Sequence, residues 1–281
     1  MILVTGATGN VGRSVVLQLA ARGIPVRALT RDKARDKDHA AMSEGVDIVE
    51  GDLSQPETLG GAFDGVDGMF LFTPPSGAGP IARLAGASGV RRVALLSSIA
   101  TQKADPRTNA IAARHHGAEQ AVMASGMAWT ILRPDSFASN ALEWAESIRS
   151  EGVVRAAYGQ SRRCPIHEDD VAAVAVCALL DPSQSGQAHW LTGPRRISVQ
   201  EQVAAIGRAL GKDIRFEELS RDEALAVMVQ RLPRPVAERL LDYARKSISE
   251  PPGLSDAIER ILGRPPKDFM QWAVDHASDF R

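Results

Sequence analysis

The 281-residue sequence is poor in the residue types that define several large classes of protein. Its two cysteines, Cys164 and Cys177, are too few for a disulfide scaffold and lack the spacing of a cysteine zinc site. Its six histidines are scattered without an H-x-x-x-H pattern, so the sequence gives no case for a bound metal. The net charge of −1 gives no reason to expect nucleic-acid binding.

The sequence also lacks membrane and export signals. No apolar run approaches the roughly 18 residues of a membrane span. The N-terminus, Met-Ile-Leu-Val-Thr-Gly, has neither a basic segment nor a cleavage site. We therefore expect a cytoplasmic protein with no membrane partner. The hydrophobic share of 44% and the length allow one large domain or two lobes with a sizeable core.

Short apolar runs alternate with helical patterns through the first half of the chain. We expect strands near 2–4, 26–29, 46–49, 69–72, 93–96 and 128–132, and helices near 10–22, 78–88 and 111–124, with a polar helix following Arg31. This alternation predicts an α/β fold, a Rossmann-type doubly wound parallel sheet with helices on both faces. Such sheets bind ligands beyond the carboxyl ends of their strands.

The pattern changes after Pro134. We expect a helix over 136–150, strands over 153–158 and 189–191, and helices over 169–180, 199–210, 221–231, 235–247 and 266–278. The predicted layout is a nucleotide-binding domain at 1–135, to which 166–194 returns. Residues 136–281 otherwise form a smaller, mostly helical C-terminal lobe that binds substrate.

Three glycines lie between the first strand and the first helix, at Gly6, Gly9 and Gly12. The first allows a tight turn, the second lets the backbone approach a diphosphate on the helix N-terminus, and the third lets helix and strand pack closely. The pattern therefore predicts nucleotide binding, with a strand–helix turn that holds no ligand as the alternative.

The Thr-Gly-Ala-Thr-Gly start and the G-x-x-G-x-x-G spacing resemble the extended and atypical branches of the short-chain dehydrogenase/reductase superfamily. The segment 125–134, with Phe137 and Asn140 after it, is similar to the NmrA-like family. The resemblance covers nearly the whole chain. It implies an NAD(P)-binding protein, either a quinone reductase or a regulator that senses the dinucleotide.

The resemblance also implies a set of cofactor-binding residues at the carboxyl edge of the sheet. They are Gly6, Thr8, Gly9, Asn10, Val11, Gly12, Arg31, Asp52, Leu53, Thr73, Pro74, Ser97 and Pro134. Thr30 and Arg31 follow the second strand, where an arginine can grip the 2′-phosphate of NADP. We expect NADP, with NAD as the alternative if Arg31 is only solvated and Asp32 turns inward.

The catalytic pair of the superfamily, a Tyr with a Lys four residues later, is missing. The two tyrosines, Tyr158 and Tyr243, are followed at that spacing by Arg162 and Ser247. No lysine occurs between Lys103 and Lys212. A lysine would lower the tyrosine pKa for proton transfer, so neither tyrosine is equipped for this role.

His115 and Glu119 stand where that pair would be, four residues apart on one helix face. We expect Glu119 to raise the pKa of His115 toward neutrality, so that His115 can donate a proton. Ser98, after the fifth strand, is the third catalytic candidate by resemblance. Alternatively, Glu119 only orients His115, the pair is a surface contact, or His116 is the inward histidine.

Four residues beyond Pro134 are candidates for binding substrate: Phe137, Asn140, Trp144 and His167. The aromatic rings suit a flat substrate, although each is equally suited to a core position. The acidic residues 168–170 after His167 are expected to stabilise a helix N-terminus, in preference to a catalytic pair or a metal site.

Three functions fit these observations. The first is hydride transfer from NADPH to a quinone or another small aromatic or activated carbonyl acceptor, which needs no strong proton donor. The second is a dinucleotide sensor without turnover. The third is a tailoring enzyme of aromatic natural-product biosynthesis that carries out oxygenation or coupling. The sequence leaves the oligomeric state open, a homodimer included.

Overall fold

The computed structural model describes residues 1–32, 45–74 and 77–281. The polar helix expected after Arg31 falls largely outside these ranges. The chain divides into two compact units. The first unit comprises Met1–Asp135, Glu168–Leu191 and Ala257–Arg264, and the second comprises Ser136–His167, Thr192–Asp256 and Pro265–Arg281.

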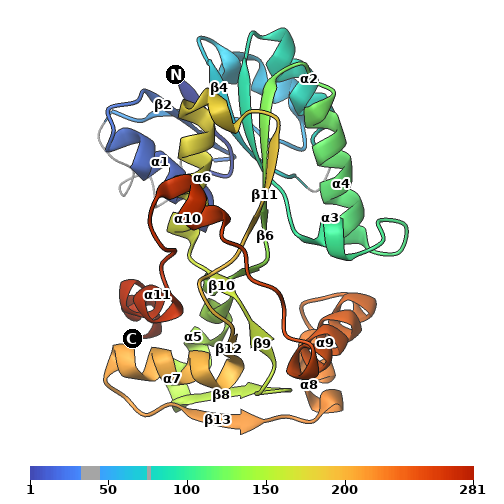
Figure 1. Cartoon of the computed structure of the whole chain (residues 1–281), viewed down its shortest axis with the longest axis vertical. Coiled ribbons are helices and arrows are strands. Elements are labelled where there is room, and N and C mark those ends of the chain that lie inside the picture. The colour runs from blue at the N-terminus through green and yellow to red at the C-terminus, as the bar shows by residue number, and fades with distance from the viewer. Residues whose placement is uncertain (33–44, 75–76) are drawn as a thin grey trace. The chain divides into compact units, whose positions relative to one another are not determined.

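The first unit is built on a parallel sheet of seven described strands (Figure 1). These are β1 (Ile2–Val4), β2 (Val26–Thr30), β3 (Asp47–Glu50), β4 (Gly68–Phe72), β5 (Arg92–Leu96), β6 (Ala128–Pro134) and β11 (Gln187–Leu191). The strand order is β11-β6-β5-β4-β1-β2-β3, so the winding direction reverses between β1 and β4. This order confirms the predicted Rossmann-type sheet, and it places the switch point beside the glycine loop.

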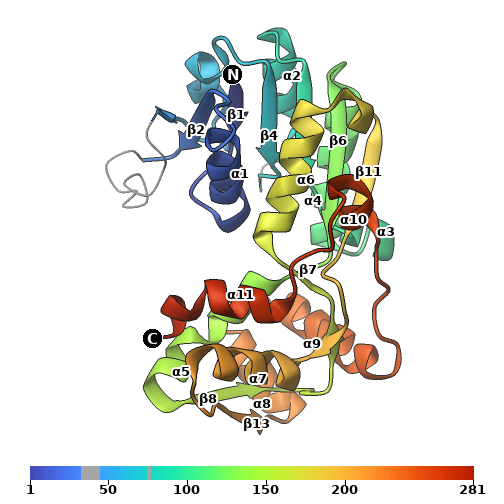
Figure 2. The same cartoon turned by 60° about the vertical axis from the view of Figure 1, so that its left-hand side comes forward.

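Helices cover both faces of this sheet, as the doubly wound prediction requires (Figures 1 and 2). One face carries α1 (Asn10–Ala20) and α6 (Glu168–Leu180), which pack on each other. The other carries η2 (Pro56–Phe63), α2 (Gly79–Ala87) and α4 (Ala110–Met123). The shorter α3 (Ala100–Lys103) and η4 (Pro182–Gln184) complete the described connections.

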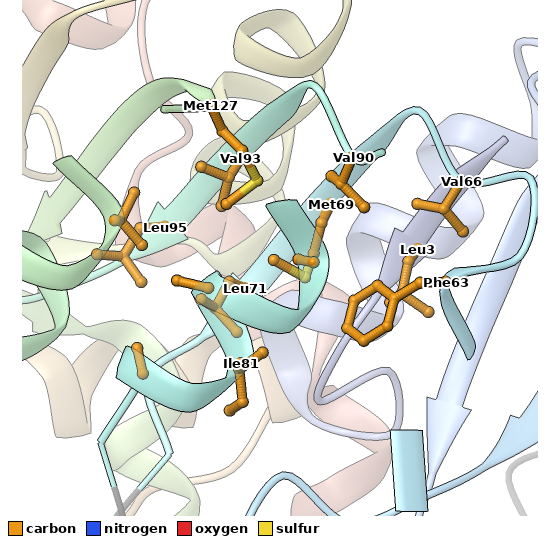
Figure 3. Close-up of a cluster of buried hydrophobic side chains, with 14 of the residues drawn as sticks. Leu3, Phe63, Val66, Met69, Leu71, Ile81, Val90, Val93, Leu95 and Met127 are labelled. Carbon is orange, nitrogen blue, oxygen red and sulfur yellow. The ribbon is translucent and has the colours of Figure 1, made fainter. Parts of the chain in front are cut away.

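The core on the α2 and α4 face is a continuous apolar cluster (Figure 3). Its strand side chains include Leu3, Met69, Leu71, Val93 and Leu95, each at most 2% exposed. Burying one such side chain stabilises the fold by about 1.5–3 kcal/mol. The end of β1, from which the glycine loop starts, is therefore held in place by this core.

The second unit contains three two-stranded sheets and several helices. The strand pairs are β7 (Ser136–Phe137) with β10 (Pro165–Ile166), β8 (Val153–Ala156) with β13 (Arg215–Glu218), and β9 (Arg162–Arg163) with β12 (Ile197–Ser198). The helices are η3 (Ala138–Trp144), α5 (Ala145–Glu151), α7 (Val199–Leu210), α8 (Arg221–Met228), α9 (Arg234–Ser249), α11 (Phe269–Asp275) and η5 (Ala277–Phe280). Ser198 and Ser220 begin α7 and α8 with capping boxes.

Two segments differ from the sequence-based expectation. Residues 136–150 form a short strand, a 3-10 helix and only then an α-helix, because β7 pairs with β10 before the helix begins. We expect only 166–194 to return to the sheet unit, whereas α10 (Ala257–Leu262) also belongs to it. An ion pair of 2.7 Å between Arg264 and the buried Asp170 anchors α10 to α6. None of the described helices is long and apolar enough to cross a membrane.

Candidate cofactor site and active site

The glycine loop lies at the switch point, and each glycine has a distinct structural reason. Gly6 adopts a φ of +61°, which a side chain rarely tolerates. A Cβ at Gly12 would lie 2.1 Å from the Gly6 carbonyl oxygen, so only glycine allows α1 to pack this closely. Gly9 is exposed, and a Cβ there would meet only the Gly6 oxygen, at 3.4 Å. Gly9 is therefore not required by packing.

This loop fits a diphosphate. Gly9 is the N-cap of α1, and no side chain caps that helix. The first backbone N–H groups of an α-helix have no partner within it, and they attract anions together with the helix dipole. The open space at Gly9 leaves these N–H groups accessible. Thr8 is half-buried, Asn10 is exposed and Val11 is buried, so the expected loop residues surround this helix end.

The ends of β2 and β3 bring Arg31 and Asp52 near each other. Arg31 is exposed directly after β2. Hydrogen bonds from Ser54 are the main cause that lowers the pKa of Asp52, and the charge of Arg31 lowers it further. The Asp52 Oδ1 atom accepts the Ser54 N–H at 2.8 Å, while Leu53 packs against the apolar cluster. Arg31 is thus an exposed cation at this edge, and Asp52 is engaged in a turn.

The cofactor-site candidates at the ends of β4 and β6 make hydrogen bonds to neighbouring segments of the protein. The Thr73 hydroxyl donates to the Leu96 carbonyl at 2.8 Å and is 1% exposed. Pro74 and Pro134 are buried, and the Pro134 carbonyl accepts the Ile99 N–H at 3.1 Å. These residues fix the strand ends that face a ligand, and the Thr73 hydroxyl is directed into the sheet edge.

Glu119 is the centre of a buried hydrogen-bond network. Arg133 binds it with two N–H groups, at 2.9 Å from Nε and 2.7 Å from Nη2. The Ser97 hydroxyl donates to it at 2.5 Å and the Thr101 hydroxyl at 3.2 Å. The network therefore joins β5, α3, α4 and β6. Among the described residues, no hydrogen bond joins Glu119 to His115.

The partners of Glu119 decide its charge. Burial opposes ionisation of Glu119, but the hydrogen bonds from Arg133 and Ser97 and the charge of Arg133 outweigh burial and lower its pKa. Glu119 is thus a fixed anion paired with Arg133, and a hydrogen-bond acceptor for Ser97. Sequence reasoning missed Arg133 and Thr101, since only the fold brings them to Glu119.

The expectation of a near-neutral pKa for His115 is wrong, although Glu119 acts in the expected direction. Burial and the neighbouring Arg114 lower the pKa of His115 to about 4, and Glu119 opposes them only weakly. Glu119 stabilises the protonated form of His115 only slightly, because its negative charge is already paired with Arg133. His115 is therefore a neutral imidazole at physiological pH.

The geometry of His115 also fixes its hydrogen-bonding roles. An Arg114 N–H lies 3.2 Å from Nε2, so Nε2 accepts and Nδ1 carries the proton. That Nδ1 is buried without a hydrogen-bond partner in the described chain. His116 is exposed, so His115 is the inward histidine. Ser98 is half-buried, and its Oγ accepts the Ala100 N–H at 3.2 Å.

The substrate candidates belong to the second unit and differ in exposure. Phe137 and Trp144 are half-buried, and Trp144 packs against the core of that unit. Asn140 is exposed. His167 is buried, with its Nε2 atom 3.3 Å from the Asp275 carboxylate. The acidic residues after His167 lie in the first turn of α6, as the sequence indicated.

The Arg133–Glu119 pair should be essential for stability. Arg133→Met leaves a buried carboxylate without its cation, and we expect a loss of about 3–5 kcal/mol in the free energy of unfolding. The contribution should be present above the ordinary pKa of the carboxyl group and lost as the pH falls through its lower pKa in the folded state. Urea unfolding at several pH values measures both effects.

Arg155→Met is the matched control, since Arg155 pairs with Glu151 and Glu217 while 40% exposed. It should cost less than about 1 kcal/mol. If both variants lose the same free energy of unfolding, the buried Arg133–Glu119 pair is no more important for stability than an exposed pair.

Comparisons with known proteins identify the family of this chain. The model of a family described as NAD(P)H-binding matches residues 6–182. A (4-alkanoyl-5-oxo-2,5-dihydrofuran-3-yl)methyl phosphate reductase of Streptomyces griseus is 41% identical over 284 residues, covering 100% of this chain and 99% of that protein. An NAD(P)H azoreductase of Xenophilus azovorans is 34% identical over 288 residues, covering 100% and 99%.

The fold comparison points the same way. The crystal structure of an NADPH-dependent quinone oxidoreductase from Escherichia coli, complexed with NADPH, has a TM-score of 0.76 at 23% identity. The match covers 98% of this chain and 99% of that one. It confirms the expected Rossmann-type fold. The chain therefore belongs to the NAD(P)H-binding family, as an NAD(P)H-dependent oxidoreductase.

Proposed function

We propose that this protein uses NADPH to reduce an acceptor that contains an electron-poor conjugated double bond, such as a quinone, an azo compound or an acylated unsaturated lactone. When bound, the cofactor supplies a hydride. The residues that would hold it are the Gly6–Gly12 loop and Arg31. The remaining task of the chain is to orient the acceptor and to stabilise the charge that develops on it.

One observation carries this proposal: His115, the histidine at the position expected for the proton donor, is buried and neutral. Its Nδ1 atom is buried, and a neutral imidazole is a very weak acid. The superfamily's Tyr–Lys pair is absent, and Glu119 is held as an anion by Arg133. The chain is therefore poorly equipped to protonate a simple alkoxide. Acceptors that delocalise the incoming electron pair need much less protonation.

The acceptors named for the relatives share this property. The 5-oxo-2,5-dihydrofuran of the S. griseus enzyme carries an alkanoyl group, so its ring double bond is conjugated to two carbonyls. An azo bond, which the X. azovorans enzyme's name indicates as its substrate, spreads charge over two nitrogens. At 41% identity over the whole chain, the phosphorylated lactone is the first acceptor to assay.

The location and assembly state are also proposals. The two free cysteines support a cytoplasmic location. The small-molecule site needs neither a membrane nor a nucleic acid. A homodimer remains the arrangement to test by light scattering.

The function is tested by NADPH oxidation with a panel of acceptors. We expect quinones, azo dyes and acylated unsaturated lactones to react at least about 100-fold faster than simple ketones or aldehydes, because only the former delocalise the developing charge. Gly9→Val is the control. It should fold normally, since the position is open, and should lose turnover because the side chain fills the space a diphosphate needs. Simple ketones reduced as fast as quinones would refute the proposed acceptor class.

Arg31 should set the choice of cofactor. We expect wild type to bind NADPH more tightly than NADH, and Arg31→Ala to weaken NADPH binding by about 1.5–3 kcal/mol, because a charge-assisted contact to the 2′-phosphate is lost. NADH affinity should stay unchanged. Arg22→Ala, an exposed arginine beyond the end of α1, is the control. Titration calorimetry measures the dissociation constants of both cofactors. If Arg31→Ala leaves the ratio of NADPH affinity to NADH affinity unchanged, a residue other than Arg31 sets the selectivity.

The chemical step should depend modestly on His115 and not on Tyr158. We expect His115→Ala to slow single-turnover NADPH oxidation about 10- to 100-fold, the low end for a donor group, and Tyr158→Phe to leave it unchanged. Because the pKa of His115 is about 4, the rate should show no titration of this group between about pH 5 and about pH 8. A large loss in Tyr158→Phe, or a step near pH 6.5 that His115→Ala removes, would overturn this assignment.

A further inference from the structure

Arg114 is a half-buried cation with no ion pair to a carboxylate among the residues that the structure describes. Its Nη2 group donates to the Nε2 atom of His115 at 3.2 Å, and its Nε atom is buried without a hydrogen-bond partner in the described ranges. Three other partly buried arginines, Arg27, Arg92 and Arg133, each pair with a carboxylate. Because a partly buried charge without a counter-ion is costly, Arg114 is expected to meet an anion from outside the described chain.

His115 holds the guanidinium of Arg114 in place. The imidazole is 8% exposed, and only its neutral form can accept a hydrogen bond from Arg114. The Nη1 group of Arg114 has no hydrogen-bond partner in the part of the chain that the structure describes and, unlike Nε, is not buried. The guanidinium is therefore oriented from one side by His115, and its Nη1 end stays accessible to a ligand.

The turn of α4 that carries Arg114 lies on the ligand side of the sheet. One turn later, Glu119 accepts hydrogen bonds from Ser97, directly after β5, and from Thr101 of α3. Since α4 leads from the end of β5 back to the start of the parallel strand β6, it runs opposite to both strands (Figure 1). Arg114 therefore lies at the carboxyl ends of β5 and β6, the edge where such sheets bind ligands.

The strand order indicates which anion can reach Arg114. The candidate site for the diphosphate of NADP is the start of α1, after β1, and Arg31, the candidate for its 2′-phosphate, follows β2. In the sheet, β5 and β6 lie beyond β4, on the other side of the switch point from β2. The phosphates of the cofactor thus have sites elsewhere along the edge, which leaves an anionic group of the acceptor as the partner of Arg114.

We propose that Arg114 is a specificity-determining residue that binds a phosphate group on the acceptor, an inference that rests on the proposed function. His115 is the positioning residue that aims its guanidinium. A guanidinium is permanently charged, and its planar N–H groups match the spacing of phosphate oxygens. The preferred acceptor is therefore a conjugated compound that carries a phosphate monoester.

The test compares kcat/KM for a phosphorylated acylated lactone and for the corresponding alcohol, with NADPH as the reductant. Wild type should prefer the phosphorylated compound, and Arg114→Gln should reduce this preference about 10- to 100-fold, mainly through KM, because a charge-assisted contact is lost. Arg114→Lys should keep part of it. Arg107→Gln is the matched control, since Arg107 is an exposed arginine shortly before α4 that pairs with Asp105. It should keep the full preference.

Variants of His115 test its positioning role. His115→Phe removes the Nε2 acceptor and should lower the same preference, whereas His115→Gln, whose amide oxygen can accept a hydrogen bond, should restore part of it. The ratio of the two kcat/KM values cancels any common effect on the chemical step. A preference that is equal in wild type and His115→Phe would remove His115 from this role.

Inorganic phosphate identifies the source of the anion. It should compete with the acceptor in wild type, with a quinone as well as with the lactone, and Arg114→Gln should raise its inhibition constant about tenfold. If Arg114→Gln instead weakens NADPH binding and keeps the acceptor preference, Arg114 binds a cofactor phosphate and the proposal is wrong. The proposal also fails if wild type reduces the phosphorylated lactone and the alcohol equally well, an outcome that leaves the proposed function intact. Failure to reduce any lactone, quinone or azo dye would instead refute the proposed function.

Discussion

The bidentate pair between Arg133 and Glu119 is the interaction on which the geometry of the candidate site depends. A carboxylate that is 2% exposed can remain charged only if its partners replace the lost water. Arg133 from β6, Ser97 from the end of β5 and Thr101 from α3 do this together. The same three groups hold α4, the helix that carries His115, against the strand ends.

This constraint also limits the chemistry. Since Glu119 is already neutralised by Arg133, it does little to stabilise an imidazolium at His115, and burial keeps that ring neutral. The residue at the expected proton-donor position is thereby a hydrogen-bond donor and a poor acid. A reductase of this kind should handle acceptors whose reduced form is a delocalised anion, and simple carbonyls would remain unreactive. The proposed acceptor class thus rests on the electrostatics of the Arg133–Glu119 pair and of the buried His115.

The sequence was sufficient for the fold because apolar runs of strand length alternate with amphipathic stretches, and local spacing decides such patterns. It also assigned the roles of Gly6 and Gly12, which depend on residues within one turn of each other. It could not find Arg133 as the partner of Glu119, because the two come from different elements and only the sheet register joins them. The low pKa of His115 was missed for the same reason: helical spacing indicates a neighbouring carboxylate but says nothing of burial or of competing cations. The short α10 was not predicted, because six residues are too few to show the hydrophobic periodicity of a helix.

The carboxyl edge of the sheet divides its groups between structure and recognition. The hydroxyls of Thr5, Thr73 and Ser97 all make hydrogen bonds within the frame. Among the described residues, the groups that this edge leaves for a ligand include the backbone N–H groups at the start of α1 and the cation of Arg31. The first is an anion site that suits a diphosphate, and the second is a point charge that suits a 2′-phosphate. The edge therefore offers separate sites to the two phosphate groups of NADP, before any acceptor arrives.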